Sequence, residues 1–189
     1  FPRIWGIGPQ VRRATNASVN HASKVARIAT QLRERAARGN TRPVSLRKKA
    51  VSHQVPKAGD LRRHDDKIDI SDLNEVLLVD PERRVCVAES GVTFVDLVTA
   101  TLRHGLVPIV VPELKTITVG GAVAGCSIES MSFVHGGFHD TCLEYELVTG
   151  TGANMRLTMS GTSQATAFVT GAVTLLEQVM KLTPAQVKA

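Results

Sequence analysis

The sequence predicts an α+β fold in which amphipathic helices and short strands share a core. Before the tail, apolar residues recur at helical spacing in two stretches, 21–38 and 93–103, which predicts two helices there. Short alternating or apolar runs bounded by turn-forming residues lie between and after these stretches, which predicts strands. The chain has 189 residues, of which 43% are hydrophobic, so we expect one globular domain with an appendage and exclude a two-domain enzyme of ordinary size.

The first helix is predicted from about residue 21 to residue 38. It follows an arm, residues 1–20, which we expect to be irregular because it has no sustained period and contains two prolines and two glycines. Gly39 stands at the expected C-cap of the helix. The apolar face of the helix consists of Val25, Ile28, Ala29, Leu32 and Ala36.

Four short strands are predicted before the second helix. The segments 42–47 and 67–70 are expected to be separate strands, and the segments 75–79 and 84–89 alternate or run apolar like a hairpin. The second helix, 93–103, should begin at Thr93, whose hydroxyl can cap its N-terminus.

The second half of the chain has fewer regular elements. The apolar segment 106–111 predicts a strand, and the segment 118–125 is small and glycine-rich, as is needed where a backbone approaches a ligand or another backbone closely. The segment 142–149 alternates as a strand should and contains Glu144 and Glu146. An apolar helix is predicted from about residue 163 to residue 180, and a short helix follows at Thr183.

Charge is distributed unevenly along the chain. The first 64 residues contain 15 basic and 2 acidic side chains, whereas the remainder contains 8 basic and 15 acidic side chains. A basic front end indicates nucleic acid only weakly, and aromatic residues for base stacking are few, at 4%. Nucleic acid is therefore disfavoured as a partner.

Cysteine content and hydropathy restrict the class of protein further. The three cysteines, Cys86, Cys126 and Cys142, form no paired spacing, so we expect buried free thiols and no metal site. No apolar run approaches the roughly 18 residues of a membrane span, and the first residues do not resemble a signal peptide. We therefore expect a cytoplasmic protein.

Several segments, in order, resemble one known family. They are the loop 43–53, the hairpin, the segment 112–125 (PELKTITVGGAVAG) and the segment 135–152 (HGGFHDTCLEYELVTGTG). Together they resemble the flavin-binding domain of FAD-linked oxidases of the vanillyl-alcohol-oxidase or PCMH type, most of all the sterol Δ24-reductase-like branch, over about residues 21–157. This resemblance implies two small α+β subdomains with FAD between them.

The resemblance also implies a cofactor site at particular positions. The first phosphate loop would contain Ser45, Arg47 and Ser52, with His53 beside it. The second would contain Pro112, Glu113, Thr118, Val119, Gly120, Gly121 and Gly125. The ribityl and pyrophosphate edge of the flavin would follow Ser127, Ile128, Glu129 and Gly136. Glycines suit such a site because they let successive backbone N–H groups turn toward a pyrophosphate.

The chain also departs from this family. Lys48, Lys49 and Ala50 stand where many members have glycines, so side-chain charge would replace close backbone approach in the first loop. The context of His53 does not favour covalent attachment of flavin. Members of the family complete the domain with further residues and add a substrate domain, whereas the resemblance stops near residue 157. We therefore expect a truncated PCMH-type domain, 21–157, in which the substrate half is missing.

The tail, 158–189, resembles a second family. The sequence MSGTSQATA from residue 159, followed by an apolar helix, resembles the C-terminal part of subtilisin-like serine proteases, which implies that Ser163 is a nucleophile at a helix N-terminus. The aspartate and histidine motifs of that family are absent, which leaves His135 and His139 as candidate bases. The alternative interpretation makes Ser163 the N-cap of a buried helix. Two resemblances in one short chain indicate a chimera, whether a natural fusion, a frameshifted product or an engineered protein.

Three functions remain open from the sequence. The first is an FAD-binding domain, or a remnant of one, from a flavin-dependent oxidoreductase. The second is a serine hydrolase built around Ser163, and the third is a basic module that binds polyanions without catalysis. A chain without native activity is the remaining alternative, and the apolar helix of the tail is expected to pack on the core or to mediate self-association.

Overall fold

The computed structural model describes residues 16–50 and 59–158 and contains helices, strands and two 3₁₀ turns. The helices are α1 (Asn16–Ala37), α2 (Phe94–Leu102), α3 (Val119–Ala124) and α4 (Ser132–His135). The strands are β1 (Val44–Arg47), β2 (Asp66–Asp69), β3 (Val76–Asp80), β4 (Val85–Ala88), β5 (Glu144–Val148) and β6 (Asn154–Thr158). The 3₁₀ turns are η2 (Leu61–His64) and η3 (Phe138–Thr141). This mixture of helices and strands confirms the predicted class at the level of a mixed α and β fold.

Helix α1 begins earlier than predicted, at Asn16, and ends as predicted before Gly39. Gly39 has a φ of +62°, and its N–H donates to the carbonyl of Ala36 at 3.0 Å. The N–H of Asn40 donates to the carbonyl of Arg35 at 3.3 Å. These two bonds terminate the helix in a left-handed turn that glycine adopts without steric cost.

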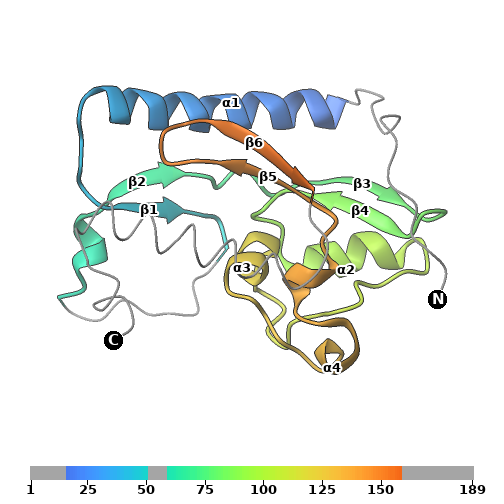
Figure 1. Cartoon of the computed structure of the whole chain (residues 1–189). Coiled ribbons are helices and arrows are strands. Elements are labelled where there is room, and N and C mark those ends of the chain that lie inside the picture. The colour runs from blue at the N-terminus through green and yellow to red at the C-terminus, as the bar shows by residue number, and fades with distance from the viewer. Residues whose placement is uncertain (1–15, 51–58, 159–189) are drawn as a thin grey trace.

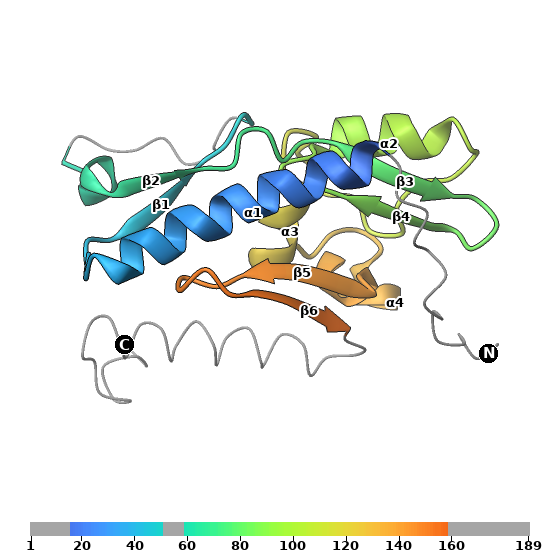
Figure 2. The ribbon, with the colours of Figure 1, turned by 90° about the horizontal axis from the view of Figure 1, so that it is seen from above.

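Three two-stranded sheets lie beneath α1. Strands β1 and β2 pair in parallel with Ser45 opposite Lys67, and β3 and β4 form the predicted antiparallel hairpin. Strand β5 pairs with β6, which was not predicted. Figure 1 shows α1 along one side of all three sheets, and the view from above shows the helix running across them (Figure 2).

The hairpin turn between β5 and β6 packs against α1 at Gly152. This glycine has a φ of +78°, and a Cβ atom built on it would lie 2.4 Å from the carbonyl oxygen of Ala29. The Nη1 of Arg33 donates to the carbonyl of Gly152 at 3.0 Å. Glycine is required here because any side chain would push the hairpin away from the helix.

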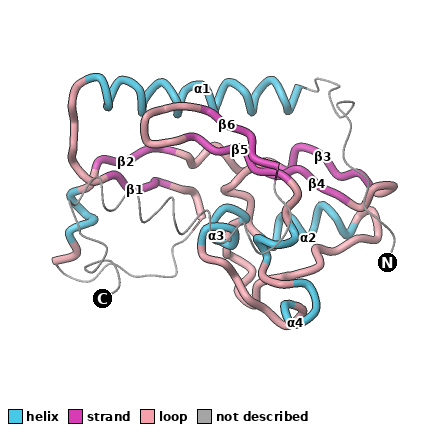
Figure 3. Tube along the Cα trace, in the orientation of Figure 1, coloured by secondary structure: helices cyan, strands magenta, loops and turns pink. Residues whose placement is uncertain are grey.

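The predicted strand 106–111 is wrong, because this segment is a loop. The burial of the side chains does alternate, with Val110 fully buried and Ile109 55% exposed, but Pro108 and Pro112 carry no N–H for a strand ladder. Figure 3 shows that loops and short helices occupy most of the chain between α2 and β5.

The described part of the chain contains two separate clusters of buried apolar residues. The first, in what we name the α2 region (β3, β4, α2 and α3), consists of Val92, Phe94, Leu97, Val110, Ala122 and Phe138. The rings of Phe94 and Phe138 meet edge to face at 4.9 Å. The second, in what we name the α1 region (α1, β1 and β2), consists of Ile28, Leu32, Ile68 and Leu73, with Val148 of β5 packed against it.

Several predictions concern residues that the structure does not describe. The predicted helix 163–180, the short helix at Thr183, most of the N-terminal arm and the second part of the first phosphate loop all lie outside the described residues. Among the described helices, none is both long and apolar enough to cross a membrane. The cytoplasmic location stays a prediction.

Candidate functional site

The base of the candidate site is the glycine-rich segment 118–125, held against the end of the β3–β4 hairpin. The N–H of Val119 donates to the carbonyl of Val92, and the N–H of Gly120 donates to the carbonyl of Ser90, both at 2.8 Å. A Cβ atom on Gly120 would lie only 2.8 Å from the Cβ of Ser90. The close approach predicted for this segment therefore occurs, and its partner at Gly120 is the backbone of Ser90.

Thr118 turns the same segment into helix α3. Its side chain is buried, and its Oγ1 accepts a hydrogen bond from the N–H of Gly121 at 3.2 Å. Its carbonyl accepts from the N–H of Ala122 at 2.9 Å, which closes the first turn. The N–H groups of Gly120 and Gly121 thus donate within the protein. This differs from the predicted reason for these glycines, since they allow close packing here and do not present free donors.

The segment after α3 brings several predicted residues together. A Cβ atom on Gly125 would lie 2.9 Å from the carbonyl oxygen of Gly121, so this C-cap also needs glycine. The carbonyl of Ser127 accepts from the N–H of Phe138 at 2.8 Å. The Oε2 of Glu129 accepts from the N–H of Glu113 at 3.3 Å, which joins the start of the second predicted phosphate loop to the predicted flavin edge.

Pro112 and Ile128, two of the predicted site residues, differ in burial. Pro112 is buried, whereas the side chain of Ile128 is 77% exposed. The neighbouring helix α4 exposes Phe133 as well, at 86%. An apolar surface therefore adjoins the predicted flavin edge.

Gly136 and Gly137 form a tight turn that contains two polar atoms without a partner. Gly136 has a φ of +77°, and a Cβ atom there would lie 2.4 Å from the Oδ2 of Asp140, which accepts from the N–H of Gly137 at 2.9 Å. The Nδ1 of His139 and the Oδ1 of Asp140 are buried without a hydrogen-bond partner among the described residues. Buried polar atoms of this kind are normally satisfied by a ligand or by water.

The first predicted phosphate loop begins at the carboxyl end of β1. Ser45 Oγ accepts a hydrogen bond from the Nζ of Lys67, and Arg47 is the last residue of the strand. This end of β1 is directed toward α3 (Figure 1), so the described parts of the two predicted loops face the same side of the molecule. Ser52 and His53 lie outside the described residues.

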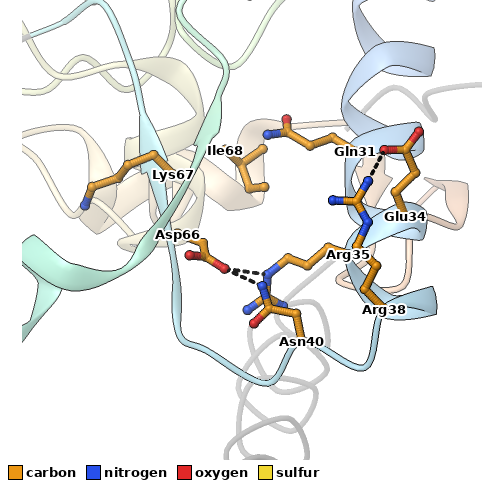
Figure 4. A pocket seen from close by; sticks show the side chains of 8 residues that line it. All are labelled: Gln31, Glu34, Arg35, Arg38, Asn40, Asp66, Lys67 and Ile68. Carbon is orange, nitrogen blue, oxygen red and sulfur yellow. Dashed lines mark hydrogen bonds and ion pairs between the residues drawn. The ribbon is translucent and has the colours of Figure 1, made fainter.

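A pocket of about 320 Å³ lies elsewhere, between the second half of α1 and the start of β2 (Figure 4). Its charged side chains are paired with one another: Asp66 accepts from Arg35 at 3.4 Å and from Asn40 at 2.8 Å, and Arg38 donates to Glu34 at 3.3 Å. None of the predicted cofactor residues lines this pocket. We therefore do not assign the cofactor to it.

The candidates for hydrolysis are not brought together by the described structure. His135 is exposed at the end of α4, whereas His139 is half-buried, with its Nε2 3.4 Å from the Oδ2 of Asp140. Ser163 lies outside the described residues, so its role as nucleophile or as N-cap stays a prediction.

The cysteines are free, as predicted, but they are not all buried. Cys86 is exposed and Cys126 and Cys142 are half-buried, which corrects the prediction of buried thiols. Burial raises the pKa of the Cys142 thiol, partly offset by hydrogen bonds to Tyr145 and Thr141. Within the described residues, no cluster of side chains has the composition of a metal site.

Sequence reasoning missed a buried ionic cluster where α1 meets β4 and β5. Glu89 has a fully buried side chain, and both of its carboxylate oxygens accept hydrogen bonds from the Nζ of Lys24, at 3.1 and 3.2 Å. His21 lies between Glu89 and Glu146. The spacing of His21 and Lys24 by three residues on one face of a helix was the only signal of this cluster.

The chain is similar in sequence to a known family of domains and to several known proteins. A family model described as an FAD binding domain matches residues 19–158. The Delta(24)-sterol reductase homolog dhcr-24 of Caenorhabditis elegans is 33% identical over 159 residues, which cover 80% of this chain and 29% of that protein. Cytokinin dehydrogenase 2 of Oryza sativa subsp. japonica is 30% identical over 157 residues, which cover 79% of this chain and 27% of that protein.

A solved structure shares the fold. The crystal structure of 6-hydroxy-D-nicotine oxidase from Arthrobacter nicotinovorans superimposes with a TM-score of 0.56 and 18% sequence identity, over 71% of this chain and 28% of that chain. The chain thus spans less than a third of the length of each of these relatives.

Proposed function

The chain belongs to the family of FAD-binding domains, and from this premise we propose that it holds FAD between the α1 region and the α2 region as the flavin-binding part of an oxidoreductase. The observation that carries the proposal is the continuous family match over 19–158, which includes both predicted phosphate loops. The relatives named above are a reductase, a dehydrogenase and an oxidase, which supports redox chemistry as the class.

We assign the cofactor contacts to two described segments. Ser45 in the first half of β1 and Arg47 at its carboxyl end would meet the pyrophosphate with a hydroxyl and a positive charge. The segment 112–129 would follow the rest of the cofactor, and the unpartnered atoms of His139 and Asp140 lie at its end, where ribityl hydroxyls can bond to them. The two regions would be the two subdomains of a PCMH-type fold.

When bound, FAD supplies a ring that accepts a hydride or single electrons. The residues of this chain would bind and orient it: Ser45 and Arg47 would hold its phosphates, and the apolar surface around Ile128 and Phe133 would shield the adjoining edge from water. Because the chain spans less than a third of its relatives, we propose cofactor binding for it and make no assignment of a substrate.

The test is reconstitution with FAD. The purified protein is incubated with FAD, free cofactor is removed by gel filtration, and the visible spectrum is recorded. We expect a stoichiometric flavin absorption that co-elutes with the protein. Protein that elutes without flavin absorption would contradict the proposal.

A matched pair of variants locates the site. Arg47→Gln should weaken FAD binding by about tenfold, because a charge-assisted bond to phosphate is worth roughly 1.5–3 kcal/mol. Arg38→Gln removes the same charge from an exposed position on α1 that pairs only with Glu34 among described residues, and it should leave the affinity unchanged. Equal effects of both substitutions would remove Arg47 from the site.

A further inference from the structure

His21 lies between two carboxylates that come from different parts of the chain. Its Nδ1 is 2.9 Å from an oxygen of Glu89, which follows β4, and its Nε2 is 2.8 Å from an oxygen of Glu146 on β5. The side chain of Glu89 is completely buried, while those of His21 and Glu146 are 21% and 25% exposed. Both nitrogens of one imidazole are therefore engaged by hydrogen-bond acceptors.

Only one charge state of the imidazole satisfies this arrangement. A neutral imidazole has one N–H and one acceptor nitrogen, whereas an imidazolium has two N–H donors. A carboxylate offers only acceptors, so a neutral His21 would bond to one of the two glutamates and set a lone pair against the other. The geometry thus requires that His21 be protonated when both contacts are made.

The other charged groups around His21 do not neutralise Glu89 and Glu146 when the imidazole loses its proton. Lys24, one turn further along α1, donates to Glu89 and to Glu75 at 3.1 Å, so its charge is shared with a third carboxylate. From the same helix, the amide of Asn20 donates to Glu75 at 3.1 Å.

On the β6 side, Glu146 accepts from the amide of Asn154 at 2.9 Å, and Arg156 lies close enough to help lower the pKa of Glu146. Three carboxylates therefore face one lysine and one histidine at the centre of the cluster. Loss of the proton from His21 leaves an excess of negative charge in a partly buried place.

The cluster stands where α1 crosses from one region to the other. Further along the helix, Ile28 and Leu32 belong to the apolar core of the α1 region. His21 and Lys24, by contrast, contact residues around β3, β4 and β5. Figure 2 shows this end of α1 lying over β3 and β4. The contacts to Glu89 and Glu75 thus fasten α1 to the α2 region, and the contact to Glu146 fastens it to β5.

We propose that His21 is a pH-sensitive latch: its imidazolium joins α1 to Glu89 and Glu146, and its deprotonation loosens the two regions and weakens FAD binding between them. The part of this inference that concerns FAD rests on the proposed function. The latch itself concerns only residues of the described chain.

The direction of the pH dependence follows from the same contacts. Burial alone lowers the pKa of His21, but hydrogen bonds and charges of Glu146 and Glu89 outweigh it, so the pKa lies above its usual 6.5. A raised pKa in the folded state means that the stabilisation is complete below about pH 6.5 and is lost as the pH rises through the folded value. At the acid side, hydrogen bonds from Asn154 and His21 outweigh the opposing effect of burial and hold the pKa of Glu146 below its usual 4.5, so this contact is lost only in stronger acid.

The experiment measures thermal unfolding of the FAD-free protein and FAD affinity from about pH 5.5 to about pH 9. For the wild type we expect the folding constant to fall about threefold to tenfold across this range, and the dissociation constant for FAD to rise in parallel. His21→Gln, which has no titrating proton, should be less stable at low pH and should flatten both profiles. Glu146→Gln should flatten them as well, because its amide can donate to a neutral imidazole, and it serves if His21→Gln does not fold.

His104→Gln is the control, since His104 is an exposed histidine just after α2. It should keep the wild-type pH profile. A His21→Gln or Glu146→Gln protein with the wild-type profile would overturn the latch. If the substitution of His21 changes the pH dependence of thermal unfolding but the FAD affinity of the wild type does not change with pH, the proposed effect of the latch on FAD binding is wrong. Absence of FAD binding at every pH would refute the proposed function and the gating, while the melting curves would still decide the latch.

Discussion

The α1 region and the α2 region are stabilised by different interactions. The α2 region has a core of six buried apolar residues that includes an edge-to-face aromatic pair. The α1 region has a contiguous cluster of four buried apolar residues without an aromatic ring, and α1 also makes ionic contacts through Lys24, Arg27 and Arg35. Apolar packing thus stabilises both regions, and on the α1 side buried ionic contacts and hydrogen bonds are added to it. A site between the two should therefore respond to pH and to charge substitutions on the α1 side.

The largest loss of stability is expected from the apolar core of the α2 region. Phe94 is 1% exposed and contacts the ring of Phe138, so Phe94→Ala should remove about 4 kcal/mol from the free energy of unfolding. Urea denaturation followed by far-UV circular dichroism measures this. A loss below about 1 kcal/mol would mean that this core does not define the region.

The next largest effect is expected from the ionic contact between the regions. Glu89→Gln leaves Lys24 in a buried place without its main counter-charge, so the free energy of unfolding should fall by about 3 kcal/mol. Glu144→Gln is the control, because Glu144 pairs at 3.6 Å with Arg156 on the surface, and its loss should be below about 1 kcal/mol. Equal losses in urea denaturation would show that burial of Glu89 has no special role.

A moderate effect is expected at Gly120, where the second predicted phosphate loop meets Ser90. Gly120→Ala places a Cβ atom 2.8 Å from the Cβ of Ser90, so the loop must shift, at a cost of about 2 kcal/mol. FAD affinity, followed by quenching of flavin fluorescence, should weaken at least about tenfold. Gly150→Ala has open space around it and should change neither quantity.

The smallest effect is expected from a surface ion pair of the α1 region. Arg27 donates to Asp72 at 2.7 Å, and both side chains are 44% exposed, so Arg27→Gln should cost about 0.5 kcal/mol. Repeating the urea denaturation in high salt should erase the difference from the wild type. A salt-independent loss comparable to that of Glu89→Gln would contradict the distinction between buried and surface pairs.

Local patterns were sufficient to predict much of the α2 region. Alternating residues predicted the β3–β4 hairpin, and Thr93 was predicted as the N-cap of α2, where its Oγ1 accepts from the N–H of Asp96 at 3.3 Å. Helix α3 was not predicted as a helix, because its glycines have low helix propensity and its position depends on bonds to Ser90 and Val92. Those partners are distant in sequence, so no local window contains them.

The uneven distribution of charge can be counted from the sequence, but the partners of the basic side chains cannot be predicted from it. From the sequence, basic side chains of the first part of the chain were expected to supply charge to the first phosphate loop. The structure instead buries Lys24 against Glu89, and it pairs Arg35 with Asp66. Lys24 and Glu89 are 65 residues apart, so their contact depends on how α1 lies across the strands. The acidic remainder of the chain is in part the counter-charge of its basic start.

The candidate site was predictable only through resemblance. Resemblance identified Thr118 and Gly120 as site residues, but their bonds to Gly121 and Ser90 depend on the folded backbone. The unpartnered atoms of His139 and Asp140 had no sequence signal, since their burial follows from the turn at Gly136 and Gly137.

The central claim is that FAD lies between the two regions, and hydrogen exchange with and without FAD tests it most directly. Peptides from the carboxyl end of β1, residues 44–50, and from the segment 112–129 should both exchange more slowly when FAD is bound. The β3–β4 hairpin, 76–88, should keep its rate. Protection confined to one region, or unchanged exchange in both segments at saturating FAD, would contradict the account.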